Sequence, residues 1–144
     1  MTMKRYEVLD HVSDAYIEAY GSSLEEAFEN AALGLFDVMV DISRVKRVFK
    51  DQFTVEAEDE ESLLHDWLST LHLKFEMEGK AYGSFKVHRI KKVSGVCRLT
   101  AKAYGEVFDP DRHAPKTEVK AVTRHRMGVT KSGGRWVVRF LLDL

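Results

Sequence analysis

The stretch "SSLEEAFENAALGLFDVMV", residues 22–40, decides the fold because it is the clearest helix in the chain. Its apolar residues recur at the three- and four-residue spacing that lines one face of an α-helix. They are Leu24, Ala27, Phe28, Ala31, Leu35, Val38 and Met39. Ser22 with Glu25 matches a capping box, and Ser23 with Glu26 is an alternative frame. The apolar face of this helix is expected in the core.

The segments on either side of this helix alternate between strand and helix patterns. A second helix is expected over residues 59–79, with Gly79 as its stop and acids in its first turn. Strands are expected at 5–10, 15–21, 47–58, 82–93, 96–108, 117–129 and 135–144. The sequence therefore predicts an α+β fold, a single-domain two-layer sandwich with two helices packed on a mostly antiparallel β-sheet.

Length and charge limit the classes of function. The chain has 144 residues, which suits one domain over 1–144, and its formal net charge is −1. Because no global field attracts nucleic acid or membrane, any charged site must be local. The single cysteine, Cys97, cannot form an internal disulfide, which favours a cytoplasmic location. No apolar run is long enough for a signal peptide or a membrane span.

The end of the chain places acids directly after an apolar strand. The side chain of Asp143 and the terminal carboxylate of Leu144 offer up to four acceptor oxygens. Hard divalent cations such as Ca²⁺, Mg²⁺ or Mn²⁺ prefer such oxygen clusters. The alternative is a solvated, frayed terminus, where acids are common. The residues alone favour that alternative.

A second polar cluster, "DHVSD", joins the first two expected strands. Asp10, His11, Ser13 and Asp14 suit a turn in which Asp and Ser side chains bond to their own backbone. The same His and Asp could also supply a metal ligand and a proton-transfer group. The residues by themselves favour the turn.

The stretch "TEVKAVTRHRMGV", residues 117–129, carries a group of cations. Alternation along a strand puts Lys120, Arg124 and Arg126 on one face, and His125 on the other, more apolar face. A line of three cations suits a phosphate or an acidic partner. An ordinary solvated face, with His125 half-buried and hydrogen-bonded, is the alternative.

Two other residue types are expected to be structural. His65 and His72, seven residues apart on the second helix, are expected at its surface or boundary. Cys97 alternates with core residues and is expected to be an inert buried thiol.

The chain resembles the archease family, whose members assist RtcB-type RNA ligases in tRNA splicing. The resemblance rests on residues 6–39 ("YEVLDHVSDAYIEAYGSSLEEAFENAALGLFDVM"), 63–71 ("LLHDWLSTL"), 105–127 ("GEVFDPDRHAPKTEVKAVTRHRM") and the ending "DL". Four such segments in order, over nearly the whole chain, make a specific match.

The resemblance implies an accessory protein and no enzyme. It implies that the protein promotes guanylylation of the ligase's active-site histidine by GTP and allows multiple turnover, with RNA reached through the ligase. It also implies a divalent metal held by Asp14, Asp143 and Leu144, and a role for Lys120 in activation. His11 and His125 belong to the matching motifs and, together with Arg124 and Arg126 beside them, are expected to bind the partner.

The sequence departs from the family pattern at two places. The front loop reads "HVSD" where "HTAD" is more usual, which removes a hydroxyl at Val12 but keeps Asp14. The later strand reads "VTRHRM" where "VTYHEM" is more usual, so Arg124 and Arg126 make this surface more basic.

Two other functions remain open from the sequence. One is a chaperone or modulator of RNA-modifying enzymes. The other is a stand-alone metal-dependent phosphate-ester hydrolase that uses Asp10, His11, Asp14 and Asp143, although no phosphate loop or clear nucleophile accompanies these residues.

Overall fold

The computed structural model describes residues 4–9 and 13–144. The helical elements are α1 (Leu24–Met39), the 3₁₀ turn η1 (Ile42–Arg44), α2 (Glu60–Glu78) and the short α3 (Pro110–His113). The strands are β1 (Tyr6–Leu9), β2 (Asp14–Gly21), β3 (Phe49–Ala57), β4 (Lys80–Val93), β5 (Val96–Val107), β6 (Ala121–Ser132) and β7 (Arg135–Asp143).

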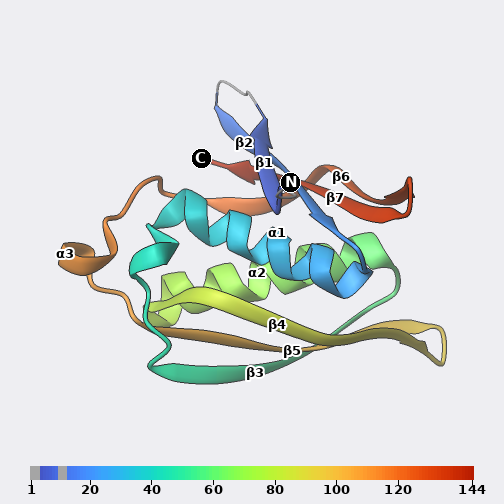
Figure 1. The fold of residues 1–144 in the computed structure, drawn as a ribbon, viewed down its shortest axis with the longest axis horizontal. Coiled ribbons are helices and arrows are strands. Elements are labelled where there is room, and N and C mark those ends of the chain that lie inside the picture. Colours follow the sequence, from blue (N-terminus) through green and yellow to red (C-terminus); the bar gives the residue numbers. More distant parts are fainter. Residues whose placement is uncertain (1–3, 10–12) are drawn as a thin grey trace.

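The strands form two separate antiparallel sheets. The four-stranded sheet has the order β1-β2-β7-β6, and the three-stranded sheet has the order β3-β5-β4. Figure 1 shows α1 and α2 side by side between them, so that each sheet has one face on the helices and one face turned outward. The core therefore lies on both sides of the helix pair.

The helices fill the space between the sheets with large apolar side chains. Phe28 and Phe36 of α1 and Trp67 of α2 have no exposed surface. The Trp67 indole N–H donates to the Phe28 carbonyl at 3.1 Å, which joins the two helices at their centre. Such a donor must be satisfied when it is buried.

The start of α1 and the end of α2 are formed by the capping residues that the sequence predicted. Ser23 is the N-cap of α1, where its Oγ accepts from the Glu26 N–H at 3.1 Å, while the Glu26 carboxylate accepts from the Ser22 N–H at 2.8 Å. The second of the two capping frames is therefore the one used. Gly79 ends α2 with φ +64°, a left-handed conformation that glycine adopts without strain.

The predicted α+β class and antiparallel pairing are confirmed. The sequence did not indicate that the strands divide into two sheets, with the helices between them instead of on an outer face. Cys97 is buried, as expected. No helix among residues 4–9 and 13–144 is long and apolar enough to cross a membrane.

The prediction of regular alternation over residues 117–129 is wrong. The strand begins at Ala121, and between Thr123 and Gly128 four residues of β6 lie opposite a single residue of β7. Arg126 takes a φ of +59° within this bulge. Such an insertion bends the strand and re-aims its side chains. His125, which lies in the bulge and was expected half-buried, is exposed, while Val122, before the bulge, is buried.

Candidate metal and partner-binding corner

Three neighbouring strands bring the candidate residues to one corner of the four-stranded sheet. Asp14, the first residue of β2, lies directly opposite Asp143, the last residue of β7. On the other side of β7, Ala121 lies opposite Asp143, and the Lys120 N–H donates to the Asp143 carbonyl at 2.8 Å. Residues that are 22 or more positions apart thus meet, because β2 and β6 begin at the same end of the sheet where β7 ends.

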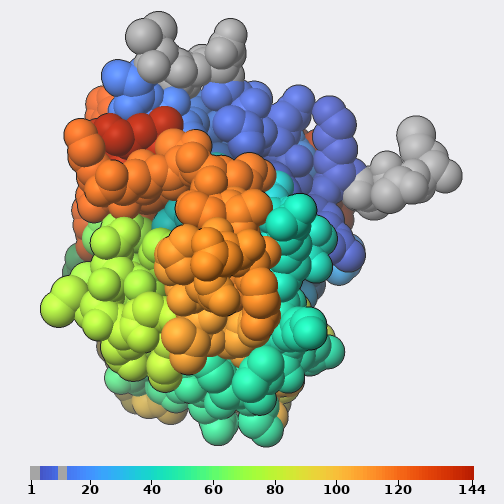
Figure 2. Space-filling view, turned by 90° about the vertical axis from the view of Figure 1, so that its left-hand side faces the viewer, coloured from blue at the N-terminus to red at the C-terminus, as the bar shows by residue number. Residues whose placement is uncertain are grey.

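The two aspartates share one face of the sheet. Directly opposed residues of an antiparallel pair have Cβ atoms roughly 5 Å apart and project to the same side. Asp143 is exposed and Asp14 is half-buried. In Figure 2, the C-terminal residues, in dark red, reach the surface beside the orange segment that leads into β6. The corner is therefore open to a ligand or to a partner protein.

Leu144 and Asp14 also line a groove of 480 Å³ beside α1. The Leu144 side chain packs against the core, so the end of the chain is held in place. Asp37 of α1 lines the same groove, where it accepts a hydrogen bond from the Tyr6 hydroxyl and lies 3.3 Å from Lys116 Nζ. Burial, and then this hydrogen bond, raise the pKa of Tyr6.

The donor atoms of this corner suit a hard divalent cation. They are carboxylate oxygens from Asp14, Asp143 and the end of the chain at Leu144, the type of ligand that Ca²⁺ and Mg²⁺ prefer. Among the residues that the structure describes, no three His, Cys, Asp or Glu side chains form a metal-binding group. The candidate set therefore depends on the terminal carboxylate as its third ligand.

The strand that leads to the corner is attached to α2 by two histidines. The His72 Nε2 donates to the Val119 carbonyl at 2.7 Å, and the His65 Nε2 donates to the Val122 carbonyl at 3.0 Å. A carbonyl can only accept, so each Nε2 carries the proton. His72 is buried, deeper than the expected surface or boundary position. The two bonds fix the strand on either side of Lys120.

This role of the histidines was missed in the sequence, although a signal was present. Seven residues are close to two helical turns, so His65 and His72 share one face of α2, beside its apolar stripe. The same spacing places both rings where they can reach the carbonyls of the neighbouring strand.

The basic residues of β6 do not form the single line that alternation predicted. Arg124 turns toward α2, where its guanidinium donates to Ser62 Oγ at 3.0 Å. Arg126 turns to the outer face of the sheet, with its guanidinium 4.7 Å from the Tyr16 ring centre. Lys120 lies at the corner with an exposed side chain. The bulge thus separates three cations that the sequence placed together.

Two other predicted site residues, Asp10 and His11, lie outside the described residues.

The fold and the corner together define a class of protein. It is a small α+β protein in which two sheets enclose a pair of helices, and two aspartates lie side by side at the ends of the central strands. The model of the archease protein family matches residues 6–144. The chain therefore belongs to the archease family.

Relatives and solved structures agree with this assignment. The chain is 48% identical to Protein archease of Thermococcus gammatolerans and 46% identical to that of Thermococcus kodakarensis, covering 99% of this chain and 100% of each relative. The solution structure of protein 1598 of Methanobacterium thermoautotrophicum superposes with a TM-score of 0.86 at 37% identity, covering 99% of this chain and 100% of that one.

A more distant structure shows the same fold. The crystal structure of an archease of Thermotoga maritima, described as a possible chaperone, matches with a TM-score of 0.60 at 20% identity, over 100% of this chain and 99% of that one. At this identity the match concerns the fold alone.

Proposed function

We propose that this protein is a cytoplasmic accessory factor that activates an RtcB-type RNA ligase in tRNA splicing. It promotes GTP-dependent guanylylation of the ligase's active-site histidine and allows multiple turnover. The observation that carries the proposal is the meeting of Asp14, Asp143 and Lys120, since the fold unites the positions that the family resemblance singles out.

In this proposal the corner holds a divalent cation through Asp14, Asp143 and Leu144. A bound cation would offset the repulsion between the carboxylates and present positive charge to an anionic group of the partner. The sheet register supports this proposal because it sets the separation of the two aspartates, and the packing of the Leu144 side chain supports it because it limits the motion of the chain end beside them.

In this proposal the Lys120 side chain contacts the partner. Its backbone is held by the bond to Asp143 and by the two histidine bonds on either side, whereas its side chain is exposed. A long flexible side chain on a fixed backbone loses less freedom on binding than one on a mobile loop. The exposed ammonium suits a carboxylate or phosphate of the ligase.

The test is guanylylation of the cognate ligase by radiolabelled GTP, with and without this protein, at matched metal concentrations. The proposal expects faster labelling of the ligase when the protein is present. An active ligase whose labelling rate does not change would overturn the proposal. Phosphate-ester hydrolysis by the purified protein alone would support the hydrolase instead, and equal stimulation of unrelated RNA-modifying enzymes would support a chaperone.

A further inference from the structure

The outward face of the three-stranded sheet carries an excess of cations. Burial along β5 alternates, and its core-facing residues are buried while Arg98, Thr100, Lys102 and Tyr104 point outward. The strand register then identifies the neighbours of these residues on the same face. The cations of this face, which we call the basic sheet face, are Lys50, Lys86, Arg89, Lys91, Arg98 and Lys102.

Among the described residues, the strands of this face contribute one acid to it, Glu56, although the chain has 23 Asp and Glu residues. Glu56 pairs with Arg98 at 2.7 Å. Lys86 Nζ also lies 3.8 Å from the Glu29 carboxylate of α1. Among the residues that the structure describes, Lys50, Arg89, Lys91 and Lys102 form no ion pair. In a protein with a net charge of −1, this is a local concentration of positive charge.

The cations lie opposite one another across the strands. Lys86 faces Lys102, and Lys91 faces Arg98, on neighbouring strands of the same sheet. Like charges that are directly opposed destabilise a sheet. An acid at either position would have stabilised the pair instead, so the folded state alone does not account for this arrangement.

Protection of the sheet edges does not account for it either. Lysines on edge strands discourage pairing with other chains, and this could explain cations on β3 and β4. Arg98 and Lys102, however, lie on β5, which is the central strand and has no free edge.

The chemistry of the face favours a polyanion over a protein. Its uncharged residues are Gln52, Thr54, Ser84, Thr100 and Tyr104, and Tyr104 is covered by the Arg47 guanidinium at 3.9 Å from the ring centre. Protein interfaces have an apolar centre and are depleted in lysine. Alternate residues along a strand are about 6.8 Å apart, so the cations form an extended array suited to a charged chain.

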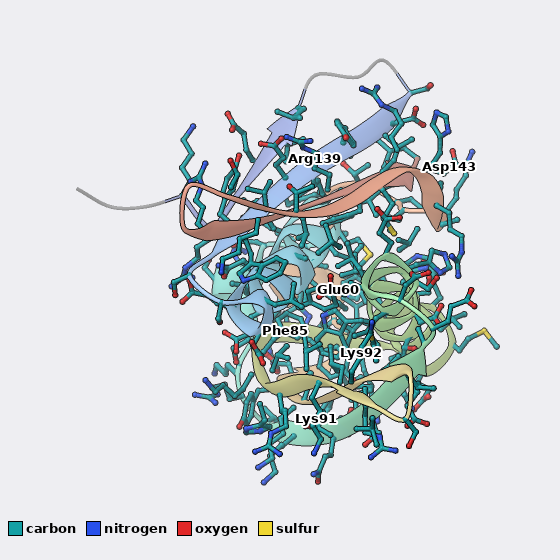
Figure 3. All side chains as sticks on the ribbon, turned by 90° about the vertical axis from the view of Figure 1, so that its right-hand side faces the viewer. Glu60, Phe85, Lys91, Lys92, Arg139 and Asp143 are labelled. Carbon is teal, nitrogen blue, oxygen red and sulfur yellow. The ribbon has the colours of Figure 1, made fainter. Side chains whose placement is uncertain are left out.

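We infer that the basic sheet face binds the phosphate backbone of a single-stranded nucleic acid without reading its sequence. Tyr104 is already stacked under Arg47, so no open aromatic platform is available there for base recognition. The choice of RNA over DNA rests on the proposed function, whereas the backbone contact does not. Figure 3 shows Lys91 and Asp143 on opposite sides of the helix layer, so RNA and ligase could be engaged together.

The test measures fluorescence anisotropy of a labelled RNA of about 20 nucleotides, and of DNA of the same sequence, in about 50 to 200 mM salt. The key variant combines Lys91→Glu with Lys102→Glu. Each change turns a like-charge pair into an opposite-charge pair, so the variant should melt no lower than the wild type. Loss of binding is thereby separated from loss of folding.

The matched control combines Lys131→Glu with Arg135→Glu, at the exposed β6–β7 hairpin of the other sheet. It has the same net charge as the key variant. We expect the key variant to bind RNA at least about tenfold more weakly, with the slope of log K against log salt reduced by about 0.7 for each lost phosphate contact. The control should bind like the wild type.

Three results would overturn the inference. The wild type could fail to bind RNA at the lowest salt, or the two double variants could weaken binding equally, which would reflect net charge alone. Binding of poly-glutamate without binding of RNA would assign the face to an acidic protein. The assay contains no ligase, so its failure is independent of the proposed activation. DNA binding equal to RNA binding would keep the backbone contact but remove the preference for RNA.

Discussion

Replacing Asp143 by asparagine should have opposite effects on stability with and without a divalent cation. Asp143 and Asp14 are directly opposed at the ends of the two central strands, β7 and β2, and Asp143 is exposed. Two like charges at this separation in a water-like environment repel by about 1 kcal/mol. In a chelator, Asp143→Asn should therefore melt up to about 4 °C above the wild type, given the size of the chain.

A saturating cation should reverse this order. A ligand at about 100 times its dissociation constant stabilises the folded state by about 2.7 kcal/mol, or about 10 °C for a chain of this size. The variant loses one carboxylate ligand and should lose most of that gain. The assay is thermal unfolding followed by circular dichroism in EDTA, and then in Ca²⁺, Mg²⁺ and Mn²⁺ separately.

Glu58→Gln is the matched control, because Glu58 is exposed at the end of β3 and the substitution removes the same charge. Its melting temperature should follow the wild type under every condition. The reasoning is refuted if none of the three cations stabilises the wild type, or if Asp143→Asn is stabilised as strongly as the wild type.

Three further outcomes follow from other contacts. Lys120→Ala should leave the melting temperature unchanged, because only its backbone bonds to Asp143, yet it should abolish stimulation of guanylylation; stimulation at the wild-type rate would count against this role. His72→Ala should lower the free energy of unfolding by about 2 kcal/mol, since the Val119 carbonyl loses its donor. Urea titration measures this difference, and an unchanged free energy would contradict a stabilising role for the hydrogen bond. Hydrogen bonds from Arg112, the Lys46 N–H and His113 lower the pKa of Glu106 to about 2, so it stabilises the folded state above its ordinary pKa of 4.5. That contribution should be lost as the pH falls from about 4.5 to 2, and Glu106→Gln should show a weaker acid dependence; an identical pH profile would contradict the assignment.

The sequence predicted the local elements well because their signals are local. The capping serine of α1, the left-handed Gly79 after α2 and the alternation along β5 depend on a few neighbouring residues. The meeting of Asp14 and Asp143 was anticipated through the family resemblance, which implies that both residues hold one metal.

The sequence did not predict features that depend on packing between distant segments. The bulge in β6 brings the Arg126 carbonyl to the Tyr16 hydroxyl at 3.2 Å and Arg124 to Ser62, contacts that span more than 60 positions. A pattern of alternation carries no information about such an insertion. The division into two sheets likewise depends on which strands pair, and each strand pattern suits either sheet.

Multiple turnover of RNA ligation tests the central claim most directly. The cognate ligase, GTP, metal and excess RNA would be combined with substoichiometric wild type, Asp14→Ala, Asp143→Ala or Lys120→Ala, each first shown to be folded. The account predicts many ligation products per ligase with the wild type, and about one or fewer with each corner variant. Wild-type turnover by all three variants would contradict the claim that this corner activates the ligase.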